Sequence, residues 1–229
     1  MSEGEEGMGS VSGGVERVSD GRQEWVRRLG VYVITDERAD LADLLRVLAA
    51  AARGGATAVQ LRRKAASGRE FVAYARALRD WTRGAGVLFF VNDRVDVAQI
   101  VDADGVHVGQ DDIACADARR LLGNRLIGVS AETTAEAKQA ERDGADYLGV
   151  GAVYATKSKA DAGRAGLVGL EEIVRSVRIP VVGIGGVTAA NAGPVLKAGA
   201  VGLAVISAVM DVPDPEDAAR RLSSHFSRR

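Results

Sequence analysis

Eight short apolar runs recur along this chain, and their recurrence constrains the fold more than any other feature of the sequence. The runs are rich in β-branched residues and lie at residues 31–35, 57–61, 87–91, 105–109, 126–130, 146–150, 180–184 and 201–206. Each run is too short for a helix of ordinary length. Their nearly continuous hydrophobicity is typical of parallel strands that are covered on both faces. We therefore expect eight buried strands.

The stretches between these runs are predicted to be helices. Residues 41–56 place apolar side chains on one stripe, formed by Leu41, Leu44, Leu45, Leu48 and Ala52. Glycines predict the ends of four helices, at Gly54–Gly55, Gly84, Gly144 and Gly199. Threonines predict the starts of two helices, at Thr133 or Thr134 and at Thr188.

Eight strand–helix units in about 200 residues predict a (β/α)8 TIM barrel. A doubly wound open sheet is the second interpretation. The barrel is preferred because there are eight runs and none looks like a polar edge strand. Residues 23–229 are expected to form this single domain, which begins with a short helix at 23–29. Residues 1–22 are rich in Gly, Ser and Glu and predict a disordered tail.

Composition narrows the classes of partner. The formal net charge is -1 over 229 residues, so bulk charge predicts neither a nucleic-acid nor a membrane partner. The single Cys115 excludes an internal disulfide and a multi-cysteine metal site. No apolar run approaches the roughly 20 residues of a membrane span, and the acidic start "MSEGEEGMGS" lacks the apolar core of a secretory signal. We expect a soluble, cytoplasmic protein.

In a TIM barrel the chemistry lies on the loops that follow the strands, and the second run ends in polar residues of this kind. Gln60, Arg62 and Lys64 alternate along the extended chain and therefore point the same way. Two cations and an amide can clamp a phosphate or a diphosphate there. A solvated basic turn is the alternative. Arg63 points the other way and is expected at the surface.

Carboxylates follow the third and fourth runs. Asn92 and Asp93 follow one run, and Asp111 and Asp112 follow the next. Neighbouring parallel strands lie about 4.8 Å apart, so two carboxylates at equivalent ends can share a cation. Oxygen ligands without His or Cys suit Mg²⁺. The alternative is that Asp93 and Asp112 cap the helices that follow them.

Two polar residues within the runs predict little chemistry by themselves. His107 lies among valines in the fourth run and is expected to be a packed core residue. Ser130 ends the fifth run and could cap a helix or contact a ligand. No histidine follows Ser130 to activate it, so a serine nucleophile is not expected.

The seventh and eighth runs end in a pattern that suits phosphate. Gly185 and Gly186 let a backbone approach a ligand closely. Backbone N–H groups at the starts of the following helices, near Thr188 and at Ile206–Ser207, can meet an anion. Barrels often bind phosphate after these two strands. A tight turn between strand and helix is the alternative.

The connection after the sixth run is the longest in the predicted barrel, and long loops of this kind are usually functional. It contains the segment "ATKSK", in which Thr156, Ser158 and Lys159 supply two hydroxyls and a charge for phosphate. Lys157 alternates away from them and is expected in solvent. Together with the other clusters, these residues predict one site with two ends that each bind an anionic group. No strong general base or nucleophile is evident, which fits the departure of a diphosphate.

Eight segments match the pattern of one enzyme family in order: "YVITD", "QLRRK", "VNDRVDVA", "DGVHVGQDD", "IGVSAET", "ADYLGVGAVYATKSK", "VVGIGGVTAAN" and "GAVGLAVISAV". Over residues 30–210 the chain resembles thiamine phosphate synthase. The resemblance implies a (β/α)8 barrel that uses Mg²⁺. It also implies the reaction, which joins 4-amino-5-hydroxymethyl-2-methylpyrimidine diphosphate to a thiazole phosphate and releases thiamine phosphate and diphosphate.

The resemblance also implies roles for individual residues. The pyrimidine diphosphate would be held by Gln60, Leu61, Arg62, Arg63, Lys64, Asn92, Ser130 and Lys159. The thiazole phosphate would be held by Thr156, Ser158, Gly186, Ile206 and Ser207. The Mg²⁺ ligands would be Asp93 and Asp112, and the residues closest to catalysis would be Arg62, Lys64, Ser130 and Lys159. The family mechanism is dissociative, with diphosphate leaving before the thiazole nitrogen attacks.

The sequence departs from the family pattern at a few positions. Ala152 and Ala155 replace prolines, Ser158 replaces a threonine, and Glu132 stands where the family often has histidine. Two other functions remain as alternatives: a thiazole tautomerase, which binds a thiazole phosphate without coupling it, and a non-catalytic phosphate-binding barrel. A homo-oligomer is possible. The retained Arg62 and Lys64, together with both aspartates and Lys159, favour the synthase.

Overall fold

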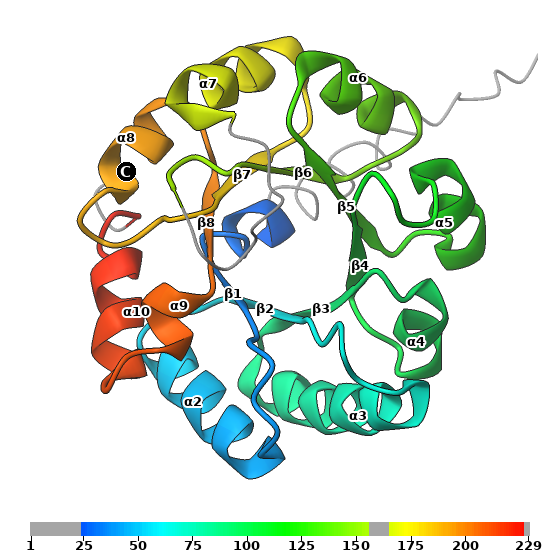
Figure 1. The fold of residues 1–229 in the computed structure, drawn as a ribbon, viewed down its shortest axis with the longest axis vertical. Coiled ribbons are helices and arrows are strands. Elements are labelled where there is room, and N and C mark those ends of the chain that lie inside the picture. Colours follow the sequence, from blue (N-terminus) through cyan, green and yellow to red (C-terminus); the bar gives the residue numbers. More distant parts are fainter. Residues whose placement is uncertain (1–23, 156–164, 227–229) are drawn as a thin grey trace, which may run out of the picture.

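The computed structural model describes residues 24–155 and 165–226, and these form a closed parallel barrel surrounded by helices (Figure 1). The strands are β1 (Val31–Ile34), β2 (Ala58–Leu61), β3 (Leu88–Asn92), β4 (Gly105–Val108), β5 (Leu126–Ala131), β6 (Tyr147–Val150), β7 (Val181–Ile184) and β8 (Gly202–Val205). They follow one another around the barrel in chain order, and β8 pairs with β1 through Val31 and Leu203. This pairing closes the sheet and confirms the predicted TIM barrel over the open doubly wound sheet.

The helices form the outer ring in Figure 1. They are α2 (Leu41–Arg53), α3 (Gly68–Ala85), α4 (Val95–Ile100), α5 (Cys115–Leu122), α6 (Thr134–Arg142), α7 (Gly166–Ser176), α8 (Ala192–Lys197), α9 (Ser207–Met210) and α10 (Pro215–Ser223). Residues 24–27 form a helical turn ahead of β1. The predicted strand ends agree with the structure to within one residue, because each buried run is bounded by polar or glycine residues that leave the barrel.

Two of the predicted helix ends are wrong. Helix α3 continues through Gly84 to Ala85 and is capped by Gly86, whose φ is 66° and whose N–H donates a bond to the Thr82 carbonyl. Thr188 does not cap α8, which begins only at Ala192. The N–H of Thr188 is instead donated to the side chain of Asn191. The predicted N-cap at Thr133 is confirmed, since its side chain accepts a bond from the N–H of Glu136.

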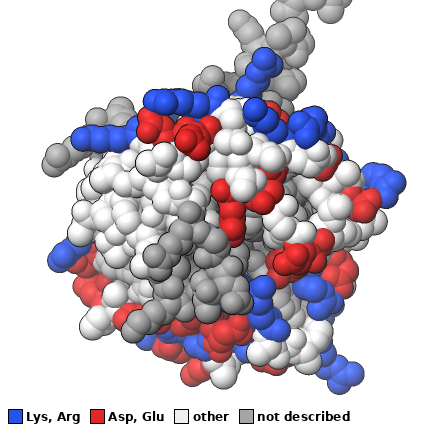
Figure 2. Space-filling model, turned by 45° about the horizontal axis from the view of Figure 1, so that its top comes forward, with Lys and Arg blue, Asp and Glu red and all other residues white. Residues whose placement is uncertain are grey.

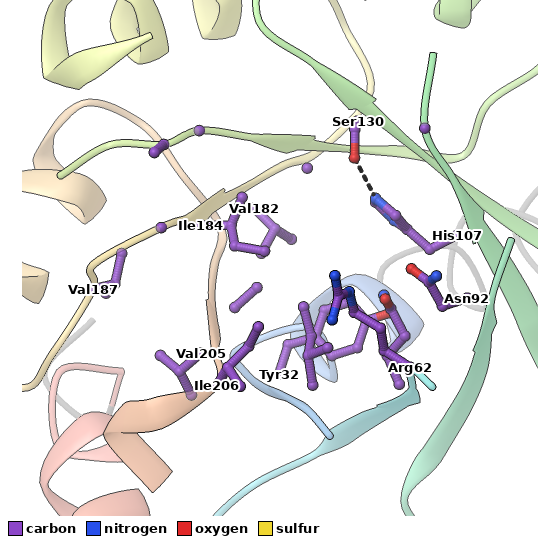
Figure 3. A pocket seen from close by; sticks show the side chains of 18 of the residues that line it. Tyr32, Arg62, Asn92, His107, Ser130, Val182, Ile184, Val187, Val205 and Ile206 are labelled. Atoms are coloured by element: carbon purple, nitrogen blue, oxygen red, sulfur yellow. Dashed lines mark hydrogen bonds between the residues drawn. The ribbon is translucent and has the colours of Figure 1, made fainter. Parts of the chain in front are cut away.

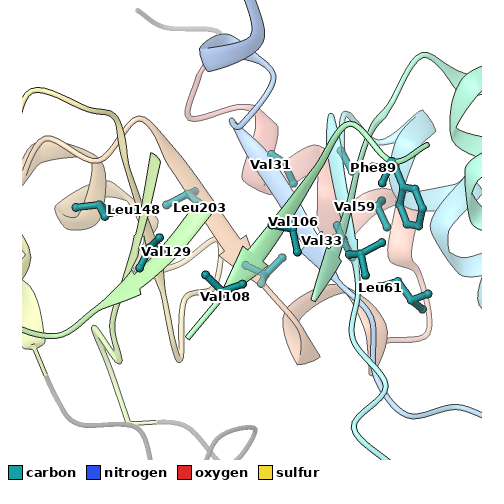
Figure 4. Close-up of a cluster of buried hydrophobic side chains, with 14 of the residues drawn as sticks. Val31, Val33, Val59, Leu61, Phe89, Val106, Val108, Val129, Leu148 and Leu203 are labelled. Carbon is teal, nitrogen blue, oxygen red and sulfur yellow. The ribbon is translucent and has the colours of Figure 1, made fainter. Parts of the chain in front are cut away.

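The core has two layers, because each strand residue faces either the helices or the barrel interior. The outward-facing side chains pack against the helices (Figure 4), and they include Val31, Val33, Val59, Leu61, Phe89, Val106, Val129 and Leu203. The inward-facing set is smaller and contains two tyrosines, Tyr32 and Tyr147, beside Phe90. Burial of both faces explains the nearly continuous hydrophobicity of the runs.

The described helices include none that is long and apolar enough to cross a lipid bilayer. The predicted tail at residues 1–22 and the predicted phosphate ligands Thr156, Ser158 and Lys159 lie outside the described residues, as does Lys157.

Candidate active site

A cavity of about 590 Å³ opens where the strands end, and residues from all eight strands or their following loops line it (Figure 3). This volume is within the range of small-molecule sites, which is about 300–1,000 Å³. The floor is formed by inward-facing side chains such as Tyr32, Ile34, Val182 and Ile184. The cavity therefore lies where the barrel fold predicts chemistry.

Of the predicted residues that the structure describes, ten line this cavity: Gln60, Arg62, Lys64, Asn92, Asp93, Asp112, Ser130, Gly186, Ile206 and Ser207. The structure thus brings the described residues of both predicted anion-binding ends into one cavity. Leu61 and Arg63 do not line the cavity. The Leu61 side chain is fully buried among the outward-facing apolar residues, which is the position its place in the strand alternation demands.

The basic end is formed by the segment that leaves β2. Thr35 Oγ1 accepts a bond of 2.9 Å from the Arg62 N–H and donates one of 3.1 Å to the Arg62 carbonyl, so this backbone is fixed to the end of β1. Glu37 Oε1 accepts a bond of 2.8 Å from the Lys64 N–H and lies 3.8 Å from Arg62 Nη1. The Arg62 and Lys64 side chains can therefore present two positive charges to an anion from a fixed backbone.

Arg63 was expected at the surface, and this prediction is wrong. The residue is only 7% exposed, and its guanidinium lies 4.1 Å from the centre of the Tyr74 ring. It donates bonds of 2.5 Å to the Arg38 carbonyl and 2.6 Å to Glu70 Oε1. A planar guanidinium can stack on an aromatic ring while it satisfies two acceptors, which makes this burial possible. Arg63 supports the basic segment from the side that faces away from the cavity.

The acidic end is a pair of carboxylates on neighbouring loops. Asp93 follows β3 with a φ of 60°, and its N–H is donated to the His107 carbonyl over 2.8 Å. Asp112 Oδ2 accepts a bond of 2.7 Å from the Gly109 N–H. Neither aspartate caps a helix, because α4 and α5 have Arg94 and Ala114 at their N-cap positions. The capping interpretation is therefore wrong.

The electrostatic environment of Asp93 disfavours its ionised form. The pKa of Asp93 is raised to about 6, first by burial and then by a hydrogen bond to Asp112 and the charge of that residue, while the charge of Lys64 lowers it in part. Two carboxylates this close repel each other when both are ionised, unless a cation lies between them. Figure 2 shows acidic side chains beside a hollow on this side of the molecule.

The carboxylate pair fits Mg²⁺, which commonly binds one or two carboxylates and completes its shell with phosphate oxygens and water. The described residues contain no group of three or more His, Cys, Asp and Glu side chains that could hold a metal ion. A metal bound by Asp93 and Asp112 would therefore need further oxygen ligands from a substrate or from water.

The Gly-rich end is a tight turn that is braced from both sides. Gly185 and Gly186 have φ values of 92° and 65°, and a Cβ on Gly186 would lie 2.6 Å from the Ala155 carbonyl oxygen. Asn191 holds the turn, donating a bond of 2.9 Å from Nδ2 to the Gly186 carbonyl. The turn interpretation is thus correct, and the turn also lines the cavity beside Ile206 and Ser207. The two interpretations do not exclude each other.

The interior end of the cavity contains a continuous chain of hydrogen bonds that the sequence did not reveal. Gln60 Nε2 donates a bond of 2.9 Å to Tyr32 Oη, which lies 3.0 Å from Tyr147 Oη. Tyr147 Oη lies 3.1 Å from His107 Nδ1, and His107 Nε2 lies 3.0 Å from Ser130 Oγ. His107 is therefore not only a packed core residue, since its ring also lines the cavity (Figure 3).

Sequence reasoning missed Tyr32 and Tyr147 as residues of the site. A signal for them was available: each hydroxyl-bearing ring lies at an inward position of the strand alternation, and a buried tyrosine hydroxyl needs a partner. Gln110 was also missed, and its Nε2 donates a bond of 2.6 Å to the Ser130 carbonyl.

Comparisons with known proteins show which family this chain resembles over most of its length. The profile of the family described as thiamine monophosphate synthase matches residues 31–209. A thiamine-phosphate synthase of Roseiflexus castenholzii is 54% identical over 202 residues, which cover 87% of this chain and 89% of that protein. A thiamine-phosphate synthase of Chloroflexus aurantiacus is 56% identical over 199 residues, which cover 86% of this chain and 92% of that protein.

Solved structures show the same relationship. A thiamine phosphate pyrophosphorylase from Pyrococcus furiosus superposes with a TM-score of 0.82 at 45% identity, covering 89% of this chain and 98% of that chain. A 3-hexulose-6-phosphate synthase superposes with a TM-score of 0.65 at 18% identity, covering 85% of this chain and 98% of that chain, and this likeness shows the barrel fold alone. The length and identity of the first set of matches show that this chain belongs to the thiamine-phosphate synthase family.

Proposed function

We propose that the protein condenses 4-amino-5-hydroxymethyl-2-methylpyrimidine diphosphate with 4-methyl-5-(2-phosphooxyethyl)thiazole, giving thiamine phosphate and diphosphate in thiamine biosynthesis. Membership of the thiamine-phosphate synthase family supports this activity directly. The observation that carries the detailed reaction is one cavity lined at one end by Arg62, Lys64 and a carboxylate pair and at the other by a Gly-rich turn. Two phosphorylated substrates need such a pair of ends.

The diphosphate is assigned to the end formed by Arg62 and Lys64. Asp93 and Asp112 would hold Mg²⁺ there, with diphosphate oxygens and water as the remaining ligands. Bound at this place, the metal would stabilise the negative charge of the leaving group. Lys64 Nζ lies 3.9 Å from Asp93 Oδ2, so the cation of this chain stands beside the carboxylates that would hold the metal. The sequence also assigns Lys159 to this end.

The pyrimidine ring is assigned to the interior of the cavity, where Gln60, Asn92 and Ser130 supply polar atoms near the buried tyrosines. The thiazole phosphate is assigned to the turn of Gly186 and to Ile206 and Ser207, with Thr156 and Ser158 added from the sequence. This arrangement would place the thiazole nitrogen and the pyrimidine methylene group between the two ends, in position for bond formation.

The bond changes need no protein nucleophile. The carbon–oxygen bond between the pyrimidine methylene group and the diphosphate breaks, and its electron pair leaves with the diphosphate. The thiazole nitrogen then uses its lone pair to form the new carbon–nitrogen bond. Positive charges at Arg62 and Lys64 stabilise the departing group, which is electrostatic rather than acid–base catalysis.

The test is to incubate the protein with both substrates and Mg²⁺ and to measure diphosphate and thiamine phosphate. Equal amounts of both products support the proposal. No thiamine phosphate from substrates that a known synthase converts would exclude it. A thiazole tautomerase would change the thiazole phosphate alone, and a non-catalytic barrel would bind a phosphorylated ligand without turnover. Omitting Mg²⁺ tests the metal assignment separately.

A further inference from the structure

The hydrogen-bond chain in the barrel interior joins five residues from five strands and ends at the cavity. It runs from Gln60 on β2 through Tyr32 on β1, Tyr147 on β6 and His107 on β4 to Ser130 on β5. Tyr32 and Tyr147 are 1% and 0% exposed. The proposed reaction uses Ser130 at one end of the chain but leaves the tyrosines and His107 without a role.

Two glycines in the neighbouring strands leave the space in which the side chains of this hydrogen-bond network come into contact. Gly128 on β5 is in register with His107 on one side and with Tyr147 on the other. A Cβ on Gly128 would lie 2.4 Å from His107 Nδ1 and 2.4 Å from Tyr147 Oη, the two atoms that bond. Gly149, in register with Ser130, repeats the arrangement, since its Cβ would lie 2.9 Å from His107 Cε1. Two side chains on β4 and β6 thus touch across β5 because β5 carries no side chain there.

The hydrogen bonds of this network can all be donated in one direction, from Gln60 towards Ser130. Among the described residues, Tyr32 Oη has hydrogen bonds only with Gln60 and Tyr147. Since the Gln60 amide nitrogen can only donate, the proton of Tyr32 must point to Tyr147 for this buried hydroxyl to be satisfied. Tyr147 then accepts from Tyr32, and its own proton points to His107 Nδ1.

The same direction of donation determines the tautomer of His107 and the orientation of the Ser130 hydroxyl. Because His107 Nδ1 accepts a bond from Tyr147, the ring proton of neutral His107 is on Nε2. That proton is donated to Ser130 Oγ. The hydroxyl proton of Ser130 therefore points away from His107 and is available to a ligand. Burial raises the pKa of both tyrosines well above 10, which keeps their hydroxyls as donors.

We infer that Tyr32, Tyr147 and His107 are positioning residues that hold the Ser130 hydroxyl as a hydrogen-bond donor. The ligand atom that receives the Ser130 proton must then be an acceptor, such as a pyrimidine ring nitrogen or a phosphate oxygen. That this ligand is the pyrimidine substrate rests on the proposed function. The donor and acceptor roles along the hydrogen-bond chain do not depend on that function.

The first test reads the His107 tautomer in the full-length protein and needs no substrate. The chain has two histidines, so long-range ¹H–¹⁵N spectra of protein labelled on histidine contain two ring systems. His225→Gln removes one of them and assigns the other. We expect a single neutral tautomer for His107, with the proton on Nε2. A proton on Nδ1, or a mixture of both tautomers, overturns the inference.

The second test is a double-mutant cycle with Tyr147→Phe and Ser130→Ala, measured by steady-state kinetics. Tyr147→Phe keeps the ring and breaks the chain, and we expect kcat/KM for the pyrimidine substrate to fall about tenfold, the value of one neutral hydrogen bond. KM for the thiazole substrate should stay unchanged. In the Ser130→Ala background the same change should have an effect of less than about twofold. Fully additive losses, or equal rises in both KM values, contradict a positioning role.

Two further variants serve as a substitute and as a control for this test. Tyr32→Phe interrupts the chain one bond earlier and should give the same pattern if Tyr147→Phe does not fold. Tyr74→Phe is the matched control, since it removes another buried hydroxyl, which donates to the Ala39 carbonyl outside the cavity. Its kcat/KM should remain within about twofold of the unchanged protein. If no variant and no wild-type protein turns over, the proposed function fails, while the tautomer still decides the inference.

Discussion

Lys64 Nζ lies 3.9 Å from Asp93 Oδ2, although the two residues leave the barrel on different strands. The contact joins the cationic segment after β2 to the carboxylate pair after β3 and β4. Lys64 touches only one of the two carboxylates, and a divalent cation bound between them would remove their mutual repulsion. The relationship gives the metal assignment a direct test.

Replacing either member of the carboxylate pair should remove metal-dependent turnover while the fold persists. We expect Asp93→Asn or Asp112→Asn to lower kcat by about 10²–10³, the loss typical of a group that stabilises developing charge. Thiamine phosphate formation over a range of Mg²⁺ concentrations measures this, and circular dichroism checks the fold. Asp111→Asn is the matched control, because Asp111 lines the same cavity without joining the pair. Wild-type rates in either variant of the pair would show the metal assignment to be wrong.

The pH dependence of stability should reveal the raised pKa of the Asp93 carboxyl group. Its pKa is raised from 3.8 to about 6 in the folded protein. The folded state then holds this proton more tightly than the unfolded state. The resulting stability is complete below about pH 4 and is lost as the pH rises through about 6, amounting to at most about 3 kcal/mol.

Urea unfolding of the metal-free protein between about pH 4 and 8 measures this contribution. Asp93→Asn cannot titrate, so its stability relative to the unchanged protein should rise between about pH 4 and 6 and stay constant above about pH 6. Added Mg²⁺ should reduce the difference, since the metal needs the ionised carboxylate. Curves that stay parallel over the whole range contradict the raised pKa.

Gly128→Ala should destabilise the barrel, because the new methyl group would lie 2.2 Å from Tyr147 Cζ. Overpacking of this kind usually costs about 1–3 kcal/mol. Thermal unfolding followed by circular dichroism measures the loss. Gly84→Ala is the control, since Gly84 lies in α3 with nothing within 4 Å of the position of a Cβ. That change should stabilise the helix by up to about 1 kcal/mol.

Gly186→Ala should weaken binding of the thiazole phosphate more than binding of the pyrimidine diphosphate. The left-handed φ of 65° and the 2.6 Å approach to the Ala155 carbonyl oxygen leave no room for a side chain, so the turn must shift. We expect KM for the thiazole substrate to rise about tenfold or more, as loss of a positioned anion contact implies. Gly86→Ala carries the same backbone strain, with a φ of 66°, in open space away from the cavity. An unchanged KM in Gly186→Ala would remove the turn from the site.

Replacing Arg62 should mainly lower activity, whereas replacing Arg63 should mainly lower stability. Arg63→Ala removes a buried side chain that packs on the Tyr74 ring and bonds to Glu70 and the Arg38 carbonyl, and we expect a loss of about 1–3 kcal/mol in unfolding free energy. Arg62→Ala should leave stability within about 0.5–1 kcal/mol and lower kcat/KM for the pyrimidine substrate. Chemical denaturation and steady-state kinetics on both variants measure the two effects. The reverse pattern would contradict our placement of the two side chains.

Much of the architecture follows from the sequence because its causes are local. The eight runs identified all eight strands, since burial on both faces requires apolar residues at every position. Strand alternation also predicted that Gln60, Arg62 and Lys64 point together, and that Arg63 points elsewhere. The same alternation, applied to Tyr32 and Tyr147, would have placed both tyrosines in the barrel interior.

Other features depend on residues far apart in the chain, and only the tertiary structure decided them. Arg63 is buried because Tyr74 and Glu70 of α3 stand where its guanidinium emerges. His107 meets Tyr147 because the register of three strands places Gly128 between them. The sequence by itself determined which residues face inward or outward, since that depends on a period of two along each strand. It could not determine which inward residues touch, because register around a closed barrel is a property of the whole sheet.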